Sequence, residues 1–176
     1  MNGKLVIVGG APGSGKTTLA RKLAKRCAVP LIEKDDVKEA IADALGVGDL
    51  TRSRELGRAA FQVMRAVAER SVEGGGTLVL EANFHRERSG PWLRGLVDRA
   101  DARVVICRAD EGVRRDRFIS RARAGVRHAV HLDFELLDLR WEPAATFDLE
   151  LGVPTLAVDT TDGYTPDFNA IVDFIA

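Results

Sequence analysis

Residues 10–17 have the sequence GAPGSGKT, in which glycines, a lysine and a hydroxyl residue are spaced to hold a phosphate group. Glycines let the backbone curl so that successive N–H groups point inward. The segment matches G-x-x-x-x-G-K-[ST] without a mismatch, and it lies between a strand pattern and a helix pattern that begins near Gly15. The helix adds the positive end of its dipole to this anion cradle. The motif therefore predicts a binding site for a nucleoside triphosphate.

Two side chains of this phosphate loop have distinct predicted roles. Lys16 can reach the β- and γ-phosphates, and the Thr17 hydroxyl can coordinate Mg²⁺. A plain glycine turn with a solvated lysine is disfavoured, because the full motif lies between a predicted strand and a predicted helix, as a phosphate loop requires. A dinucleotide loop is a poor match, because the third glycine of G-x-G-x-x-G is missing. With ATP as the expected nucleotide, the predicted binding residues are Gly10, Ala11, Pro12, Gly13, Ser14, Gly15, Lys16, Thr17 and Thr18.

The elements around the loop alternate between strands and amphipathic helices. Short apolar runs predict five strands, at residues 4–8, 31–32, 77–80, 104–106 and 155–158. Apolar residues at helical spacing predict helices after the first and second of these strands and at the end of the chain. Such alternation indicates an α/β fold with a parallel sheet covered on both faces. Ligands of these sheets bind beyond the carboxyl ends of the strands, so the residues that follow each strand are the candidates for function.

Carboxylates and a lysine follow the second predicted strand, where residues 33–38 have the sequence EKDDVK. A carboxylate at Asp35 could accept the proton of an acceptor hydroxyl or orient that hydroxyl for in-line attack. Lys38 lies one helical turn later and could grip an anionic group of the acceptor. On position alone, a helix start with an Asp cap, acidic residues in its first turn and an exposed lysine is an equally good interpretation.

Arginines are concentrated in one segment of a chain whose formal net charge is zero, so this basic site is local. Arg114, Arg117 and Arg121 fall on one face of a helix that Asp110 can cap and Gly125 can end. Like charges at this spacing repel by roughly a few tenths of a kcal/mol per pair, and an anionic ligand should offset that cost. The alternative is a solvated helix whose arginines pair with its own acidic residues.

The third predicted strand is followed by Glu81 and Asn83, and an acidic group at such a position often reaches Mg²⁺ through water. Glutamate replaces the usual aspartate, so the metal role of Glu81 stays open. His85, Arg86 and Arg88 lie in the predicted loop that follows, where they could line an acceptor pocket or be exposed loop residues. Asn83 and Arg86 are the predicted acceptor-binding residues here.

Two histidines, His128 and His131, follow the arginine segment. A structural metal is not expected, because no cysteine or carboxylate cluster accompanies them at zinc spacing. Their position suggests a hinge or a contact with the acceptor. Trp92 and Trp141 are interpreted as packing residues rather than as a cofactor cage.

Several of these segments together resemble the P-loop kinases grouped with zeta toxin, chloramphenicol phosphotransferase and the kinase domain of polynucleotide kinases. The segments are GAPGSGKTT, KDDVK, LEANF, RFISRARAGVRHAVHLD and VDTT, and the resemblance covers residues 4–161. It implies a three-layer P-loop NTPase fold with a five-stranded parallel sheet. It also implies an arginine-rich helical lid near residues 110–131, within the single domain that the chain length predicts for residues 1–176.

The resemblance implies roles for individual residues. Asp35 corresponds to the general base of a D-x-x-[RK] element, with Lys38 at the basic position. A lysine lacks the bidentate fork of the commoner arginine, so an acceptor phosphate need not be implied. Arg117 and Arg121 correspond to lid arginines that close over the triphosphate and stabilise the transferred phosphoryl group.

The predicted function is an ATP-dependent phosphotransferase that uses Mg²⁺ and moves the γ-phosphate to a hydroxyl of a small molecule. Lys16, Asp35, Arg117 and Arg121 are its predicted catalytic residues. The alternative is a regulatory or switch NTPase without a small-molecule acceptor; a GTPase is disfavoured because N-K-x-D is absent. Nucleic acid is possible as an acceptor but not favoured, because little aromatic interleaving beyond Phe118 accompanies the arginines.

The composition is that of an ordinary globular protein, with 26 basic and 26 acidic residues in 176. Zero net charge gives no general attraction to nucleic acid or to an anionic membrane. The apolar run at residues 5–8 is too short for a signal peptide or a membrane span. Cys27 and Cys107 do not look like a disulfide framework or a redox pair. We therefore expect a cytoplasmic protein with no membrane partner.

Overall fold

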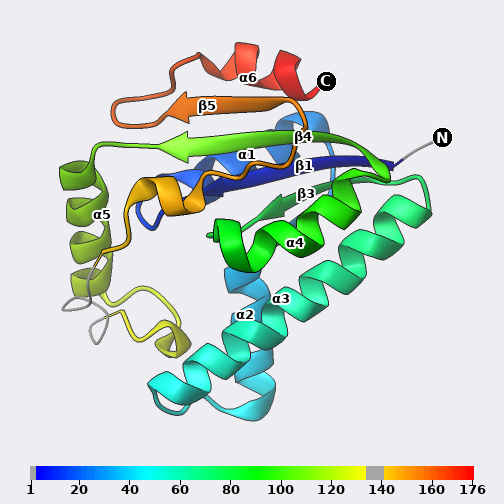
Figure 1. Ribbon diagram of the computed structural model, residues 1–176. Coiled ribbons are helices and arrows are strands. Elements are labelled where there is room, and N and C mark those ends of the chain that lie inside the picture. Colours follow the sequence, from blue (N-terminus) through cyan, green and yellow to red (C-terminus); the bar gives the residue numbers. More distant parts are fainter. Residues whose placement is uncertain (1–2, 134–140) are drawn as a thin grey trace.

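Five parallel strands form the centre of the molecule in the order β2-β3-β1-β4-β5 (Figure 1). The computed structural model describes residues 3–133 and 141–176. The strands are β1 (Gly3–Gly10), β2 (Leu31–Glu33), β3 (Thr77–Glu81), β4 (Ala100–Arg108) and β5 (Thr155–Asp159). The central strand β1 is buried along nearly its whole length, as is typical of a parallel sheet between helical layers. The predicted α/β fold with a five-stranded parallel sheet is confirmed.

Helices cover both faces of this sheet (Figure 1). They are α1 (Lys16–Cys27), α2 (Lys34–Leu45), α3 (Leu50–Glu73), α4 (Arg86–Val97), α5 (Glu111–Ala124) and α6 (Phe168–Ile175), with short 3-10 turns η1 (Ala129–His131) and η2 (Ala144–Phe147). On one face Met64 of α3 and Leu93 of α4 pack against the sheet. On the other, Leu19 of α1 and Ile171 of α6 do the same. The result is a three-layer α/β/α arrangement.

Helix α4 occupies a segment for which the sequence pattern predicts a loop. His85 caps it, because its Nδ1 accepts a hydrogen bond from the Glu87 backbone N–H at 3.3 Å. Pro91 lies inside the helix and obscures its periodicity, although Leu93 is fully buried beneath it. His85 and Arg86 therefore belong to the start of a packed helix rather than to an exposed loop.

The register of three neighbouring strands places the ends of β1, β2 and β3 at one level. Glu33 of β2 pairs with Glu81 of β3, and Glu81 pairs in turn with Val8 of β1. Asp35 lies two residues beyond Glu33, and Gly10 lies two residues beyond Val8. The chain thus leaves β2 beside the phosphate loop, with only β3 between them.

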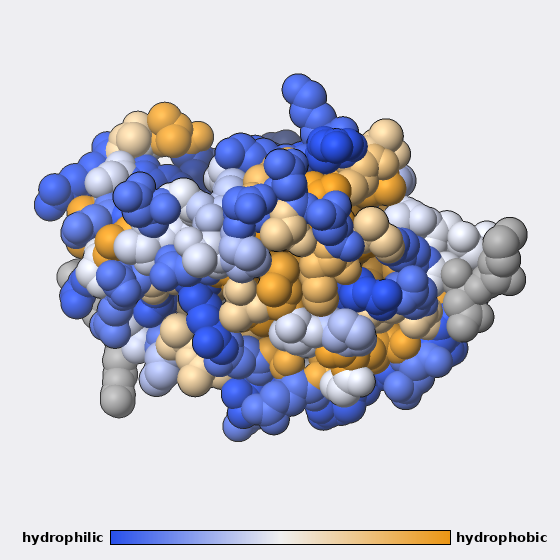
Figure 2. All heavy atoms as spheres, turned by 90° about the horizontal axis from the view of Figure 1, so that it is seen from above, coloured by the Kyte–Doolittle hydropathy of each residue, from blue (hydrophilic) through white to orange (hydrophobic). Residues whose placement is uncertain are grey.

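The outer surface mixes hydrophilic and hydrophobic side chains. Seen from the side of β5 and α6, hydrophobic residues reach the surface in the middle of the face and hydrophilic residues surround them (Figure 2). Helix α3 has 24 residues. In the part of the chain that the structure describes, none of the helices combines the length and the hydropathy needed to cross a membrane.

Candidate active site

The loop between β1 and α1 has a backbone conformation that requires glycine. Gly10, Gly13 and Gly15 have φ angles of 145°, 78° and 75°. A Cβ atom on Gly10 would lie 2.5 Å from the Cys107 carbonyl oxygen, and one on Gly13 would collide with the carbonyl of Arg114. A side chain at either position would therefore force the loop away from its neighbours. The predicted curl of the phosphate loop is present, and β4 and α5 pack closely around it.

The interior of this loop contains polar groups without a protein partner. Gly15 precedes the first residue of α1, and no side chain caps the helix. The N–H groups of its first turn therefore have no side-chain partner. Ser14 is fully buried, and its Oγ has no hydrogen-bond partner among the described residues. Free donors at a helix N-terminus suit an anion. The residues present therefore fit the triphosphate that the motif predicts.

Lys16, the first residue of α1, lies against the end of β3. Its Nζ is 3.4 Å from Oε1 of Glu81, whose side chain is 4 % exposed. Burial raises the pKa of Glu81, while the charge of Lys16 opposes that rise. The Thr17 hydroxyl and the Glu81 carboxylate are hard oxygen groups of the kind that Mg²⁺ prefers. The described residues contain no cluster of three or more His, Cys, Asp or Glu able to hold a metal alone, so phosphate oxygens would have to complete such a site.

The short edge strand β2 is tied to α1 by a two-pronged ion pair. Arg21 Nε lies 2.6 Å from Glu33 Oε1, and its Nη2 lies 2.8 Å from Oε2. Glu33 is 5 % exposed and is the last residue of β2. This pair fixes the point where β2 becomes α2, and it thereby fixes the residues that follow beside the phosphate loop.

Asp35 lies in the first turn of α2 with its carboxylate among positive groups. Lys34 Nζ is 2.9 Å from one carboxylate oxygen, and Arg127 Nη2 is 2.5 Å from the other. His131 Nδ1 lies 4.0 Å away. The side chain is 41 % exposed, so an incoming hydroxyl can reach it. Asp35 does not cap α2, because Glu33 precedes the helix; the capping interpretation is wrong.

The charge state of Asp35 follows from these neighbours. Burial alone would raise the pKa of the Asp35 carboxyl, but Lys34 and Arg127 outweigh it, with smaller contributions from His131 and Lys16. Together they hold that pKa well below its ordinary value. Asp35 is therefore an ionised hydrogen-bond acceptor at neutral pH.

Lys38 is buried, although one interpretation of the sequence makes it an exposed lysine. Only 6 % of its surface is exposed, and its Nζ donates to Ser53 Oγ at 2.7 Å and to the Val130 carbonyl at 3.0 Å. Burial, assisted by the charge of Lys34, lowers its pKa to about 8. The ammonium thus joins α2 to α3 and η1, and one donor remains for the predicted contact with an acceptor.

Arg117 of α5 contacts the phosphate loop. Its Nη1 donates to the Gly13 carbonyl at 3.4 Å, and its Nη2 donates to the carbonyls of Thr160 and Thr161 at 2.7 and 3.0 Å. Asp110 precedes α5 but forms no side-chain cap, whereas Gly125 ends the helix in the left-handed conformation, as predicted. The structure thus places Arg117 against the phosphate loop.

The other two arginines of the predicted face have different partners. Arg121 Nε lies 3.7 Å from Asp133 Oδ2, and its guanidinium lies over the Phe118 ring. Arg114 is 2 % exposed, and its guanidinium lies 5.7 Å from the Trp141 ring centre. Trp141 also packs edge-on against Phe118, in agreement with its predicted packing role. Among the described residues, none of these arginines pairs with an acidic residue of α5, so the ion pairs expected of a solvated helix are not found.

The residues after β3 contribute unequally. Asn83 Oδ1 is buried and has no hydrogen-bond partner in the described chain, which suits a group that meets a ligand. Arg86 donates instead to the Asp148 and Ala145 carbonyls at 3.0 and 3.1 Å, and it pairs with Glu150 at 2.9 Å. Arg86 therefore fastens α4 to the η2 segment, and its contact with an acceptor stays a prediction.

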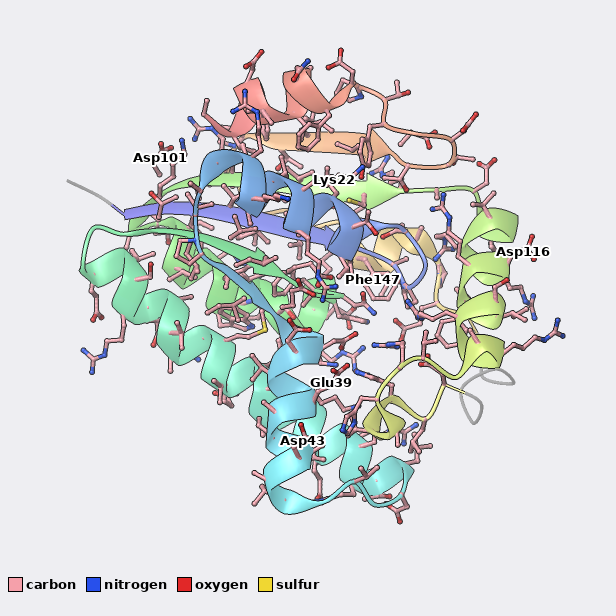
Figure 3. All side chains as sticks on the ribbon, turned by 180° about the vertical axis from the view of Figure 1, so that it is seen from behind. Lys22, Glu39, Asp43, Asp101, Asp116 and Phe147 are labelled. Carbon is pink, nitrogen blue, oxygen red and sulfur yellow. The ribbon has the colours of Figure 1, made fainter. Side chains whose placement is uncertain are left out.

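Residues 125–133, here named the return segment, lead back from α5 and dock on α2. His128 Nε2 lies 3.0 Å from Asp43 Oδ1, and His131 Nε2 lies 2.6 Å from Glu39 Oε1. Figure 3 shows Glu39 and Asp43 along α2, on the side where the yellow return segment lies. Val130 is fully buried in a small apolar cluster with residues of α2 and α3. The predicted hinge or acceptor role of the histidines is thus accompanied by a structural one.

Sequence reasoning gave no role to two residues that the structure places beside Asp35, namely Arg127 and Asp133. Arg127 Nη1 donates to Asp133 Oδ1 at 2.9 Å while its Nη2 contacts Asp35. A cavity of about 250 Å³ lies beside them and is lined in part by Arg121 and Gly125. The arginine segment was visible in the sequence, but no local pattern indicates which arginine reaches back to Asp35.

Comparisons with known proteins show the family and the fold of the chain. A family model described as an AAA domain matches residues 5–139. A crystal structure described as a "putative kinase" from Chloroflexus aurantiacus J-10-fl has 34 % sequence identity and a TM-score of 0.83, and the match covers 99 % of this chain and 97 % of that one. The resemblance to P-loop kinases predicted from the motifs is confirmed at this level. A search of curated proteins found no match.

More distant solved structures share the fold. The APS kinase CysC of Mycobacterium tuberculosis, in complex with AMPPNP and APS, has 16 % identity and a TM-score of 0.61, with 99 % of this chain and 98 % of that chain covered. A gluconokinase from Sinorhizobium meliloti 1021 has 22 % identity and a TM-score of 0.50, with coverages of 99 % and 89 %. At these identities the likeness concerns the fold.

Proposed function

Since the chain belongs to the AAA domain family, we propose that it is an ATP-dependent kinase that transfers the γ-phosphate of Mg-ATP to a hydroxyl of a small-molecule acceptor. The observation that carries the proposal is the position of Asp35. An ionised carboxylate follows β2 at the level where β1 enters the phosphate loop, with only β3 between them. A phosphate-holding loop beside an accessible carboxylate is the arrangement that phosphoryl transfer to a hydroxyl needs.

On the nucleotide side, the backbone N–H groups of the loop and the Lys16 ammonium hold the phosphates. Thr17, with Glu81 behind it, would hold Mg²⁺, which when bound neutralises charge on the β- and γ-phosphate oxygens. Arg117 already contacts the loop through the Gly13 carbonyl. Arg121 lies one turn further along α5 and would turn from Asp133 toward the transferred group. These two arginines are the lid charges of the proposal.

On the acceptor side, Asp35 accepts a hydrogen bond from the acceptor hydroxyl and aligns its oxygen with the γ-phosphorus. The oxygen–phosphorus bond forms, the bond from the γ-phosphorus to the bridging oxygen breaks, and ADP leaves. The hydroxyl proton passes to Asp35 and then to water. A carboxylate of lowered pKa is a weak base, so Asp35 acts mainly by orientation, which suits a loose transition state.

The acceptor itself would be bound by residues that surround Asp35. Asn83 has a buried oxygen without a partner, and Lys38 has one donor left. Arg86 would need to release part of its contact with the η2 segment to join them. The Chloroflexus relative, described as a "putative kinase", supports the same class of reaction.

A second candidate function is a regulatory or switch NTPase without a small-molecule acceptor. It is favoured by one observation: both Asp35 oxygens are already engaged by cations, as in a structural ion pair. In that case nucleotide binding would persist but no hydroxyl would be phosphorylated.

The test is ³¹P NMR of wild-type protein with Mg-ATP and pooled hydroxyl-bearing metabolites, antibiotics and 5′-hydroxyl oligonucleotides. A new phosphoester that is absent with Asp35→Ala supports the kinase and identifies its acceptor. Asp36→Asn is the matched control, because Asp36 is the next residue and its side chain is 61 % exposed. If the protein binds ATP but forms no phosphoester, or if Asp35→Ala transfers phosphate as fast as wild type, the regulatory or switch NTPase becomes the better-supported function.

A further inference from the structure

Arg127 connects two carboxylates from distant parts of the chain. Its Nη2 lies 2.5 Å from Asp35 Oδ2 at the start of α2, and its Nη1 lies 2.9 Å from Asp133 Oδ1 at the end of the return segment. The Arg127 side chain is 21 % exposed and that of Asp133 is 8 % exposed. A planar guanidinium held at both ends has a fixed orientation, unlike a single-point lysine contact.

The backbone that carries Arg127 is itself held in place. Gly125 ends α5 in a left-handed conformation with φ of 60°, two residues before Arg127. The residues that follow are anchored to α2 through His128 and His131, and through Val130, whose carbonyl accepts from Lys38. Arg127 therefore reaches Asp35 from an anchored segment, and only two residues separate it from the end of α5.

Each element around Asp35 contributes a charged or titratable group. Lys34 and Glu39 come from α2 itself, and Lys16 comes from α1. Glu81 lies at the end of β3, beside Lys16. His131 lies 4.0 Å away on the return segment, and burial lowers its pKa to about 3, so it is neutral at pH 7. Of the cations, Arg127 alone comes from the segment that follows α5.

We propose that Arg127 is a positioning residue that holds the Asp35 carboxylate toward the acceptor and links its orientation to the lid helix α5. Asp133 holds Arg127 in turn. The inference rests on the proposed function, because it concerns the residue proposed to orient the hydroxyl. Helix α5 carries Arg117, which contacts the phosphate loop, and it leads directly into the segment that carries Arg127. This helix would therefore couple the nucleotide to the acceptor side.

The first test measures Asp35 directly and needs no acceptor. The carboxyl resonance of Asp35 is assigned in ¹³C NMR with Asp35→Asn and titrated in wild type, Arg127→Gln and Arg127→Lys. We expect the pKa of Asp35 to rise toward its ordinary value in Arg127→Gln and to be largely restored in Arg127→Lys. Arg65→Gln is the matched control, because it removes an arginine from an ion pair on the exposed side of α3. An unchanged Asp35 titration in Arg127→Gln overturns the proposal.

The second test uses the acceptor identified by phosphate transfer. Arg127→Gln should lower kcat by about 100-fold, as expected for a misplaced reacting group, while the Kd for ATP changes less than twofold. Because the pKa of Asp35 rises in this variant, its kcat should also decrease as the pH is lowered toward that pKa. Arg127→Lys should recover part of the lost kcat. Equal kcat in wild type and Arg127→Gln, or a lysine variant no better than glutamine, contradicts the proposal.

Two further results separate the possible failures. If circular dichroism shows that Arg127→Gln does not fold, Asp133→Asn replaces it, since this change loosens Arg127 and leaves its contact with Asp35. A smaller rise in the pKa of Asp35 and a smaller fall in kcat are then expected. Their absence overturns the proposal. If wild type transfers phosphate to no acceptor, the proposed function fails, and the proposal falls with it even where the titration shows the Arg127 contact.

Discussion

The nucleotide side and the acceptor side of the candidate site are built in different ways. The phosphate loop uses backbone geometry, since Gly10, Gly13 and Gly15 have φ angles that favour glycine, and such a curled backbone is suited to bind an anion through its N–H groups. The acceptor side uses paired side chains, with Asp35 engaged by Lys34 and Arg127. A backbone site is formed by consecutive residues, whereas a charge-paired site depends on tertiary contacts. The two sides should therefore respond differently to mutation.

The largest effect is expected on the nucleotide side. Lys16→Met removes the ammonium that neutralises the transferred phosphate, so phosphate transfer should fall by about 1000-fold. The measurement is the initial rate with the identified acceptor. Lys25→Met, in the last turn of the same helix, is the control. A loss below tenfold would mean that Lys16 does not contact the transferred group.

A smaller effect is expected from strain in the phosphate loop. Gly13→Ala places a Cβ at φ of 78° against the Arg114 carbonyl, so it should lower the free energy of unfolding by about 2 kcal/mol and weaken ATP binding at least about tenfold. Urea unfolding and calorimetric titration measure the two quantities. Gly112→Ala meets nothing within 4 Å and should leave both nearly unchanged. Equal behaviour of the two variants would show that the loop is not held against α5.

The smallest effect concerns pH and the acceptor side. Burial lowers the pKa of His131 to about 3, so between pH 6.5 and 3 the unfolded chain binds a proton that the folded chain does not. Stability is therefore lost as the pH falls through this window, by about 2 kcal/mol at pH 5 relative to pH 7. His131→Gln should remove this loss in urea unfolding at the two pH values. His85→Gln is the control. If the free energy of unfolding of His131→Gln still differs between pH 7 and pH 5 as much as that of wild type, the burial of a neutral imidazole is contradicted.

The same contrast explains what the sequence could predict. The phosphate loop and the parallel sheet were predictable because their signals are local: an eight-residue loop pattern and short apolar runs. Asp35 was found because it follows a strand. Arg127 was not assigned to it, since the contact joins residues 92 positions apart. The burial of Lys38 likewise depends on the carbonyl of Val130, which also lies 92 residues away. Helix α4 was missed because Pro91 and neighbouring glycines obscure its period.

The most direct test of the account asks whether the two sides are separable. In Asp35→Asn, the Kd for ATP should stay within twofold of wild type, while the rate of phosphate transfer falls by about 100-fold or more. Calorimetric titration and the transfer rate, measured on the same preparation, give both numbers. Retained ATP affinity with lost transfer is the result that the account predicts. Full transfer activity in Asp35→Asn, or loss of ATP binding in parallel with transfer, would contradict the assignment of Asp35 to the acceptor side.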